Sequence, residues 1–425
     1  MTASSGRVDL VVIGLGYVGL PLVCEAIKSG LSVQGLDISQ TVVDQLNAGQ
    51  SHVDDISNEE LSQALSRGFQ ATTNDSILEN ADAVIICVPT PLSVDGGPDL
   101  TSVEQAAEKV AKHVHADQLV VLESTTWPGT TEEVVVPILE KASGLSAGND
   151  FFVAFSPERI DPGNSKWNVK NTPKIVGGVN ERSTIAAGAL YGKFIDTIVI
   201  AKGTREAETA KLLENTYRHV NIALVNEMAK FCHDLGIDLW DVIRLAATKP
   251  FGFQAFYPGP GVGGHCIPID PSYLGYRVKA SLGYPFRFVE LAQEINASMP
   301  NYVVGRIQDL LNASGKPLKG AKVLLLGVTY KPDIADQRES PAVPIAIGLD
   351  QLGAEVSFHD PLVEKWLVEG ETRARVHDVA NAVKSADIVV LLQNHSTYLA
   401  DDLAAHSQAF LDTRGVTTSD DSQRL

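Results

Sequence analysis

The stretch VDLVVIGLGYVGLPLVCEAIKSGLSVQGLD, residues 8–37, decides the fold of the N-terminal part of the chain. It begins with a short apolar run, which predicts a buried parallel strand. Gly14, Gly16 and Gly19 follow in a GxGxxG pattern, and after them come a helical segment, a second apolar strand and Asp37. Strand, glycine loop, helix, strand and acidic residue in this order are the fingerprint of a dinucleotide-binding fold.

Each glycine of the fingerprint has its own physical task. Gly14 makes the tight turn, Gly16 admits the pyrophosphate, and Gly19 lets the helix pack closely on the strand. Tyr17 and Val18 belong to the same loop, so their backbone is expected at the cofactor. The pyrophosphate is expected at the positive N-terminal end of the helix. The alternative is a glycine-rich turn without a ligand.

Asp37 indicates which dinucleotide is bound. Its carboxylate is placed to accept hydrogen bonds from the hydroxyls of the adenosine ribose. A phosphate at that point would be repelled, so the sequence favours NAD over NADP.

Polar residues follow the next predicted strands. The apolar strand at 83–88 leads into Pro89 and Thr90, and the one after it leads into Ser124 and Thr125. In an open parallel sheet, ligands bind beyond the carboxyl ends of the strands. These residues are therefore expected at the cofactor, where the hydroxyls of Ser124 and Thr125 would donate to a nicotinamide or hold a water. For any single hydroxyl, plain helix capping is the alternative.

A further strand at 151–155 is followed by Glu158 and Arg159. A carboxylate and a guanidinium at a strand end are suited to a polar ligand, and Glu158 is a candidate general acid or base. An exposed Glu–Arg pair is the alternative. Two more strands, at 175–178 and 197–200, are expected to complete this lobe.

The periodicity then changes to that of a helix, over residues 204–235. Lys211 and Asn215 lie four residues apart, on one face of that helix. A half-buried lysine suggests a task, such as holding a developing oxyanion, with Asn215 as a second donor. A solvated helix face is the alternative. More helix is predicted at 239–247 and 285–311.

Between these last two helices lies YPGPGVGGHCIPIDPSY, residues 257–273. Glycines let a backbone approach a ligand closely, and a cysteine behind such a loop is a candidate nucleophile. A tight turn with a buried, inert Cys266 is the alternative. Its neighbour His265 is interpreted as a structural or ribose-contacting residue.

A linker at 314–319 precedes a fresh strand at 322–327, and strands and helices then alternate to about residue 415. This region predicts a second, smaller doubly wound sheet that lacks GxGxxG. It carries Lys331, Arg338 and Arg414 near strand exits, which suits a phosphate-bearing ligand. Ordinary surface charge is the alternative for any one of them. Residues 417–425 are polar and are expected to fray.

The predicted fold class is therefore α/β, with two doubly wound Rossmann-like domains joined by a central helical segment that contains one long helix. The expected boundaries are 1–203 for the dinucleotide domain, 204–313 for the central segment and 314–425 for the second domain. The long helix is also the expected interface of a homo-oligomer, a dimer or larger.

Composition excludes several classes of protein. The chain has 425 residues, 44% of them hydrophobic, and a formal net charge of −18, which argues against a nucleic-acid surface. Its four cysteines show neither metal-ligand spacing nor a disulfide framework, so we expect a reducing, cytoplasmic location and no metal. We also expect no signal peptide and no membrane segment.

In its motifs the whole chain resembles the UDP-glucose/GDP-mannose dehydrogenase family. The resemblance rests on GLGYVGLPL, VPTPL, ESTTWPGTT, SPERIDPG, AETAKLLENTYR, PGPGVGGHCIPIDP, GVTYKPDIADQRESPA and LDTRG in that order. It implies a four-electron, NAD-dependent oxidation of the C6 alcohol of a UDP-sugar to the uronic acid, which serves polysaccharide biosynthesis. A thiohemiacetal and then a thioester would form on the nucleophile.

The resemblance also implies roles for single residues. Cys266 would be the nucleophile and Lys211 the oxyanion stabiliser. Asn215 and Asp270 would place and activate water or transfer protons, and Glu158 would act as acid or base. Thr125 would hold the hydrolytic water. The residues implied in binding NAD are Gly14, Gly16, Tyr17, Val18, Gly19, Asp37, Pro89, Thr90, Ser124, Thr125 and Arg338. The residues implied in binding the UDP-sugar are Glu158, Arg159, Lys211, Asn215, Tyr257, Gly259, Gly261, Gly263, Lys331 and Arg414.

Within the family, SPERIDPGN, ATKPFGF and GGHCIPIDP resemble the branch that acts on N-acetylated hexosamines. Where UDP-glucose members carry an arginine ahead of the nucleophile, this chain has Pro250. UDP-N-acetylglucosamine is therefore the first choice of substrate, followed by its galactosamine epimer, with UDP-N-acetylmannosamine and UDP-glucose as alternatives.

Two rival functions remain at this stage. A two-electron β-hydroxyacid-type dehydrogenase also joins a dinucleotide lobe to helices with Lys and Asn four residues apart, but it needs neither the thiol nor a second nucleotide lobe. A non-catalytic sugar-nucleotide sensor would keep the sites without turnover.

Overall fold

The computed structural model describes residues 7–93, 97–161, 164, 166–264, 267–418 and 422–425. The chain forms two compact units. The first consists of Met1–Glu214 with Ser272–Tyr284, and the second of Asn215–Pro271 with Pro285–Leu425.

The first unit contains a mixed sheet with the strand order β3-β2-β1-β4-β5-β6-β7-β8. Strands β1 to β6 run parallel to their neighbours, β7 is antiparallel to β6, and β8 is parallel to β7. The strand bounds are Val8–Ile13 (β1), Val33–Leu36 (β2), Ala71–Thr72 (β3), Ala81–Ile86 (β4), Leu119–Leu122 (β5), Phe152–Phe155 (β6), Lys174–Gly178 (β7) and Ile198–Ile200 (β8).

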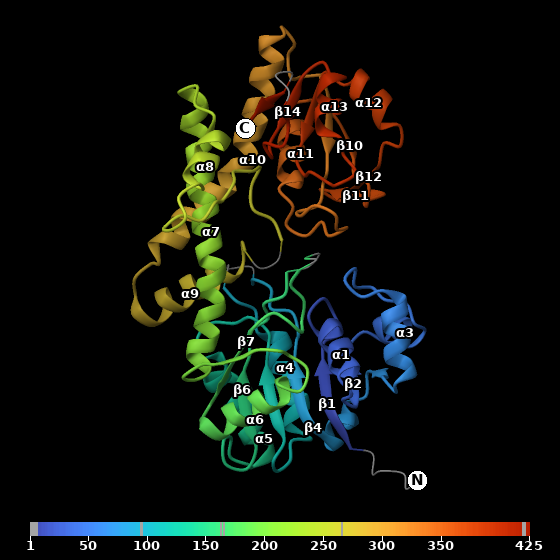
Figure 1. Cartoon of the computed structure of the whole chain (residues 1–425), viewed down its shortest axis with the longest axis vertical. Coiled ribbons are helices and arrows are strands. Elements are labelled where there is room, and N and C mark those ends of the chain that lie inside the picture. The colour runs from blue at the N-terminus through green and yellow to red at the C-terminus, as the bar shows by residue number, and fades with distance from the viewer. Residues whose placement is uncertain (1–6, 94–96, 162–163, 165, 265–266, 419–421) are drawn as a thin grey trace. The chain divides into compact units, whose positions relative to one another are not determined.

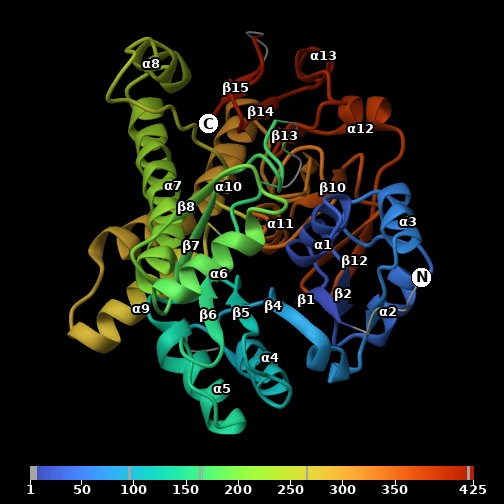
Figure 2. The same cartoon turned by 60° about the horizontal axis from the view of Figure 1, so that its bottom comes forward.

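Helices cover both faces of this sheet (Figures 1 and 2). On one face, Leu10 and Val12 of β1 share a core with α1, α2, α3 and α6, and on the other Val11 and Ile13 share a core with α4 and α5. A strand buried on both faces has no polar side, which is why β1 is apolar without interruption from Leu10 to Ile13. The helix bounds are Gly19–Lys28 (α1), Gln40–Asn47 (α2), Asn58–Ser66 (α3), Thr101–Ala111 (α4), Val136–Ser143 (α5) and Glu181–Tyr191 (α6), with short turns at Asp75–Asn80 (η1) and Thr131–Val135 (η2).

Helix α9 (Asp270–Leu282), which the sequence analysis did not predict, packs from Ser272 onward within the first unit. Tyr273 is fully buried and its hydroxyl donates a hydrogen bond to the main-chain carbonyl of Thr90. Arg277 forms an ion pair with Glu133 at 2.6 Å. These contacts fasten α9 to the loops that follow β4 and β5.

The second unit contains a parallel sheet with the order β10-β9-β13-β14-β15 and a small hairpin, β11-β12. Leu324 and Leu326 of β9 face a core with α12 and α13, whereas Val323 and Leu325 face a core with α10 and α11. The bounds are Lys322–Leu326 (β9), Glu355–His359 (β10), Lys365–Val368 (β11), Glu371–Ala374 (β12), Ile388–Leu391 (β13), Phe410–Asp412 (β14), Gln423–Arg424 (β15), Leu239–Ala246 (α8), Arg287–Ala313 (α10), Ala342–Gln351 (α11), Val379–Ser385 (α12) and Ala400–Ala405 (α13).

The long helix α7 (Thr204–Asp234) continues from the first unit into the second. Together with the two doubly wound sheets it confirms the predicted fold class. None of the helices in the described ranges is long and apolar enough to cross a membrane.

The expectation that residues 417–425 fray is wrong for the residues of this segment that the structure describes, 417–418 and 422–425. Gln423 and Arg424 add a parallel strand to β14, and Leu425 is buried. The hydroxyl and the amide of Thr417 both donate to the buried carboxylate of Asp412, at 2.7 and 2.8 Å. Local polarity suggested solvent, but these polar groups satisfy a buried acid at the end of β14.

Candidate functional site

The glycine loop after β1 has the geometry that a dinucleotide requires. Gly14 has a φ of +90°, and a Cβ there would lie 2.5 Å from the carbonyl oxygen of Cys87. A Cβ on Gly19 would overlap the carbonyl of Gly14, whereas one on Gly16 would meet no described atom within 4 Å. The first and third glycines are therefore required by packing, and the second leaves open space for a ligand.

Asp37 does more than the sequence predicted. One carboxylate oxygen accepts a hydrogen bond from the amide of Leu15, inside the glycine loop, and the other accepts from the amide of Ser39, both at 2.9 Å. The carboxylate thus ties the glycine loop to the end of β2. Each oxygen keeps a second lone pair, so hydrogen bonds to ribose hydroxyls remain available.

The start of α1 also fits an anion. Its N-cap residue, Val18, forms no side-chain capping bond, and the first turn of the helix carries no acidic residue. The amides there are suited to a pyrophosphate, because helix N-termini carry unsatisfied donors and positive potential. With open space at Gly16 and a carboxylate at Asp37, the described residues of the loop fit an NAD dinucleotide.

The hydroxyls at the ends of β4 and β5 serve the protein itself. Thr90 donates to the carbonyl of Thr125 at 2.8 Å, and Ser124 donates to the carbonyl of Val88 at 2.7 Å. These two bonds cross-link the ends of two strands, and the contact of Thr90 and Ser124 with the cofactor stays a prediction. Thr125 is half-buried at that cross-link, and Pro89 is exposed.

A buried ion pair at the end of β5 escaped the sequence analysis. Glu123 and Lys174 lie 2.8 Å apart, and the hydroxyl of Tyr191 donates to the same carboxylate. Burial alone would lower the pKa of the Lys174 ammonium, but the Glu123 carboxylate raises it above its ordinary value. The ESTT motif was the sequence signal that pointed to Glu123. Its partners Lys174 and Tyr191 lie too far along the chain for the sequence to show the contact.

Lys211 is buried, with 7% of its surface exposed, and its ammonium donates to the main-chain carbonyl of Glu158. No ion pair of Lys211 occurs within the described residues. This rejects the solvated-face alternative. Arg159 pairs with Glu214 at 2.7 Å and donates to the carbonyl of Pro173, so the loop after β6 is docked on α7. The carboxylate of Glu158 accepts from the amide of Ile160, and the alternative of a Glu158–Arg159 ion pair is not found among the described residues, where Arg159 pairs with Glu214.

In the second unit, Asn215 donates its side-chain amide to the carboxylate of Asp270 at 2.5 Å, and both side chains are buried. Asn215 and Asp270 are far apart in the sequence, yet the structure brings their side chains into contact. They form a hydrogen-bonded pair of the kind that positions water or transfers a proton.

The second unit also brings the glycine loop near two predicted substrate motifs. A Cβ on Gly259 would lie 3.0 Å from Nη1 of Arg414, and one on Gly263 would lie 2.7 Å from Cβ of Tyr330. The amide of Gly264 donates to the carbonyl of Arg338 at 3.1 Å. Tyr257 is exposed at the start of this loop.

Arg414 has the surroundings of an anion-binding group. Burial lowers the pKa of its guanidinium to about 10, against the attraction of Asp412. Its Nε donates to the carbonyl of Leu392 at 2.6 Å. Lys331 is half-buried in the loop after β9. A guanidinium whose charge is destabilised by burial gains from a bound phosphate.

Two predicted residues need separate mention. Arg338 is exposed and pairs with Asp336 at 2.6 Å, so its predicted contact with the cofactor stays a prediction. Cys266 lies outside the described residues, as does His265.

Glu208, three residues before Lys211, was missed by the sequence analysis. Its carboxylate is fully buried and accepts from the amide of Gly129 at 2.5 Å and from the amide and hydroxyl of Thr131 at 2.9 and 2.7 Å. Burial raises its pKa to about 7. The sequence signal that pointed to Glu208 was an acidic residue among the alanines of the AETAK stretch of the predicted helix.

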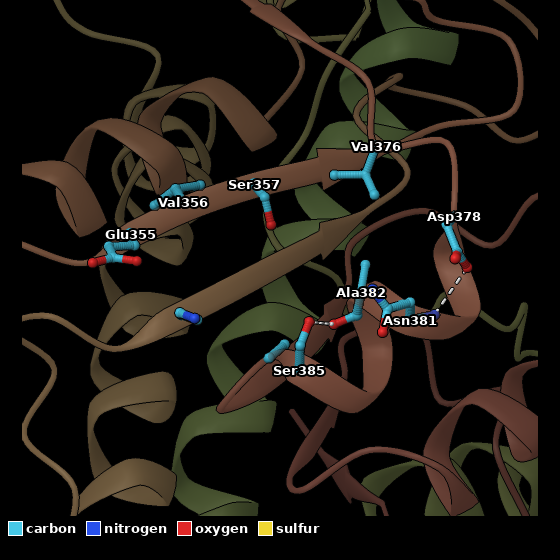
Figure 3. A pocket seen from close by; sticks show the side chains of 10 residues that line it. Glu355, Val356, Ser357, Val376, Asp378, Asn381, Ala382 and Ser385 are labelled. Carbon is cyan, nitrogen blue, oxygen red and sulfur yellow. Dashed lines mark hydrogen bonds between the residues drawn. The ribbon is translucent and has the colours of Figure 1, made fainter.

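A cavity of about 430 Å³ lies elsewhere in the second unit, beside β10 and α12 (Figure 3). Lys322 and Glu355, which begin β9 and β10, line it, together with Asp378, Asn381 and Ser385. In a parallel sheet, ligands bind beyond the carboxyl ends of strands, whereas this cavity lies at amino ends. Its lining includes none of the predicted site residues, so it is not assigned to the function.

Comparison with known proteins identifies three consecutive family segments. Residues 8–195 match the UDP-glucose/GDP-mannose dehydrogenase family, NAD binding domain. Residues 205–298 match the central domain of that family, and residues 324–419 match its UDP binding domain.

Individual relatives match over most of their length. A UDP-N-acetyl-D-mannosamine dehydrogenase from Pyrococcus horikoshii is 35% identical over 92% of this chain and 90% of its own. A UDP-N-acetyl-D-glucosamine 6-dehydrogenase from Pseudomonas aeruginosa is 37% identical over 83% of this chain and 82% of its own. A solved UDP-D-ManNAc dehydrogenase structure from Pyrococcus horikoshii superimposes with a TM-score of 0.88 at 34% identity, covering 97% of this chain and 96% of its own.

The open space at Gly16 leads to a first prediction. Gly16→Ala should fold normally, because its Cβ meets no described atom within 4 Å, but the added methyl should obstruct the pyrophosphate and weaken NAD binding by about tenfold or more. Titration with NAD, followed by fluorescence, measures this. Gly305→Ala, which also adds a Cβ into open space, is the control and should bind NAD like the wild type. Equal affinity of the Gly16 variant would contradict the assignment.

The buried Glu208 carboxylate leads to a second prediction, on pH. Its folded pKa of about 7 lies above its ordinary value of 4.5, so its contribution to stability is lost as pH rises through neutrality. In Glu208→Gln this loss should disappear, so the unfolding free energy should depend less on pH between about 4.5 and 7, the ordinary and the folded pKa of the carboxyl. The amide should cost about 1 kcal/mol at acidic pH, because it sets a donor against the amide of Gly129.

Urea denaturation at several pH values measures both effects. Glu227→Gln, at an exposed position of the same helix, is the control and should keep the wild-type pH dependence. A Glu208→Gln curve parallel to that of the wild type would show that this carboxyl does not titrate near neutrality.

Proposed function

Because the chain belongs to the UDP-glucose/GDP-mannose dehydrogenase family, we propose that it oxidises the C6 alcohol of a UDP-N-acetylhexosamine to the uronic acid in two NAD-dependent steps. The observation that carries the proposal is the buried Lys211 ammonium, which has no ion-pair partner within the described residues and lies beside the loop after β6. A buried cation is costly unless it stabilises a charge, and an oxyanion formed during oxidation is such a charge.

Bound NAD supplies the hydride acceptor for both oxidations. The glycine loop, Asp37 and the cross-linked ends of β4 and β5 are the groups proposed to hold it. Arg338 is proposed as a further contact. The fit of the loop to a dinucleotide supports this assignment, because of the three fingerprint glycines Gly16 is the one where a Cβ would meet no described atom within 4 Å.

In the proposed mechanism the chain's own residues handle charge and protons. Lys211 stabilises the alkoxide that forms at C6 as the alcohol is oxidised to an aldehyde. The Cys266 thiolate then adds to the aldehyde carbon and gives a thiohemiacetal, whose oxidation yields a thioester. Water cleaves the thioester, and the products are the carboxylate and the free thiol.

Asn215 and Asp270 are proposed to place the hydrolytic water and accept its proton, which their hydrogen bond and burial support. Glu158 is proposed as a second acid or base, and Thr125 as a further contact of that water.

The UDP moiety is proposed to bind in the second unit, to Lys331, Arg414 and the loop at 257–263. The half-buried guanidinium of Arg414 next to Gly259 supports this. Arg159 and Glu158 are proposed near the sugar. UDP-N-acetylglucosamine is the first choice of substrate, and the names of the relatives also support UDP-N-acetylmannosamine.

We further propose a homodimer formed through α7. Tyr217, Leu224 and Phe231 recur every seven residues on this helix and are exposed, as is Leu235. A regular apolar stripe on a long helix is suited to packing against a second copy. The three free cysteines among the described residues support a reducing, cytoplasmic location.

The main test measures NADH formed per substrate across UDP-N-acetylglucosamine, UDP-N-acetylgalactosamine, UDP-N-acetylmannosamine and UDP-glucose. We expect two NADH per molecule and the highest kcat/KM with UDP-N-acetylglucosamine. Cys266→Ser should lose the complete oxidation while still binding NAD and UDP-sugar, because it removes the nucleophile. One NADH per substrate would instead identify a two-electron dehydrogenase, and no NADH with any of the four sugars would favour a sensor.

Lys211→Ala should lower kcat by about 100-fold or more with little change in substrate affinity, because an oxyanion donor acts mainly in the transition state. Steady-state kinetics and equilibrium binding measure the two effects. Lys230→Ala is the control on the same helix, since that ammonium donates to Ser298 instead. An unchanged kcat would remove Lys211 from the mechanism.

A further inference from the structure

We propose that Asn226 and Asn296 form a buried amide relay that positions the glycine loop at 257–264 and thereby sets the reactivity of the thiol that follows it. Both are positioning residues, because they act through Gly259. The statement about the thiol rests on the proposed function, whereas the statement about the loop does not.

Asn226 is the centre of the relay. It lies on α7, is fully buried, and its side-chain oxygen accepts a hydrogen bond from the amide of Gly259 at 2.9 Å. Its side-chain nitrogen donates to the side-chain oxygen of Asn296 on α10, also at 2.9 Å. One side chain thus satisfies a buried loop amide and couples it to a second helix.

Asn296 fixes which way these amides point. Its nitrogen donates to the main-chain carbonyl of His219 at 3.3 Å and lies 3.4 Å from Nδ1 of the same histidine. A carbonyl only accepts, so the nitrogen of Asn296 must face His219 and its oxygen must face Asn226. Burial lowers the pKa of His219 to about 4, so its ring is neutral at neutral pH, and the tautomer with its proton on Nε2 accepts at Nδ1 from the nitrogen of Asn296. Each amide then has one orientation that satisfies all of its partners.

The loop depends on such backbone anchors because its four glycines have no side chains with which to hold it. A Cβ on Gly261 would lie 3.0 Å from Cβ of Pro341, and its φ of +144° disfavours other residues. A Cβ on Gly263 would lie 2.7 Å from the carbonyl of Glu339. The loop is therefore held by packing and by two main-chain hydrogen bonds, from Gly259 to Asn226 and from Gly264 to Arg338.

The anchored position also faces the proposed phosphate site. A Cβ on Gly259 would lie 3.0 Å from Nη1 of Arg414, so the loop and the guanidinium are packed together. Release of Gly259 from Asn226 would displace the loop against that guanidinium as well. A small displacement of a reacting group costs up to about 100-fold in rate, even when the change lies away from the chemistry.

The test compares Asn226→Leu, Asn226→Asp and the control Asn221→Leu. Leucine is close in size to asparagine but neither accepts from Gly259 nor donates to Asn296, whereas aspartate still accepts from Gly259. Asn221 lies on the same helix, is half-buried and donates only to its own helix, at the carbonyl of Tyr217. The measurements are kcat and KM for the UDP-sugar, NAD affinity, the rate of iodoacetamide modification of Cys266 followed by peptide mass spectrometry, and hydrogen exchange of the peptide that contains 257–264.

For Asn226→Leu we expect a fall in kcat of about tenfold or more, a changed modification rate at Cys266 and faster exchange of the loop, with NAD affinity unchanged. Asn226→Asp should retain more activity than the leucine variant. Asn221→Leu should match the wild type in every measurement. If Asn226 had only a structural role, Asn226→Leu would shift the unfolding midpoint but would not lower kcat while leaving NAD affinity unchanged.

Wild-type kcat, thiol reactivity and loop exchange in Asn226→Leu would overturn the proposal. If Asn226→Leu does not fold, Asn226→Asp and Asn296→Asp provide the test. The relay would be overturned if both variants showed wild-type kcat, thiol reactivity and loop exchange. Failure of the proposed function is recognised separately, because the wild type itself would then yield one NADH per substrate or stay active after Cys266 is modified. Loop exchange still reports on the positioning role in that case.

Discussion

Buried backbone amides in loops need partners, and this need determines where the functional segments of the chain lie. A loop at a strand end has no neighbouring strand to satisfy its amides, and a buried, unpaired amide costs about 1–3 kcal/mol. Several buried or half-buried side chains meet the need here, three of them in the segments of the proposed site. Asp37 accepts from Leu15 in the first glycine loop, Glu208 accepts from Gly129 after β5, and Asn226 accepts from Gly259.

The consequence is that binding loops are supported by side chains from outside themselves. Glu208 lies on the same helix as Lys211, so one element both carries a proposed catalytic ammonium and fastens a strand-end loop. Tyr273 of α9 likewise fastens the loop after β4, by donating a hydrogen bond to the carbonyl of Thr90. Groups held in this way are pre-organised, which favours interactions that act in a transition state.

The parts of the fold that were predicted from the sequence depend on local patterns. The apolar run of β1, the three fingerprint glycines and the helical period of α7 are each encoded within a short stretch, and each appears in the structure. The ends of elements were less accurate, as for β4, which was predicted at 83–88 and spans Ala81–Ile86. Polar residues next to an apolar run indicate that a strand ends nearby. They do not show which residue is the last of the strand and which is the first of the loop.

The parts that were not predicted depend on long-range partners. Glu123 appeared to be an ordinary residue of a loop motif until Lys174 and Tyr191 were found against it. Glu208 gave only the signal of an acid within an apolar motif, since its partners are backbone amides far along the chain. The pairing of Gln423 and Arg424 with β14 has no local signal at all, because the segment is short and polar.

The charges of the proposed site also show why net charge is a poor guide to ligands. The chain carries a net charge of −18, yet Lys211 is a buried cation with no ion pair among the described residues, and Arg414 is a guanidinium whose pKa burial lowers to about 10. Solvent-exposed carboxylates beyond a Debye length of about 8 Å are largely screened in physiological salt, whereas a buried cation acts on its neighbours at low dielectric. If the proposed site is correct, attraction of an anionic nucleotide depends on these few cations, and the many surface acids oppose it only weakly. The same burial that makes these cations costly in the free protein is what would make an incoming phosphate or oxyanion their favourable partner.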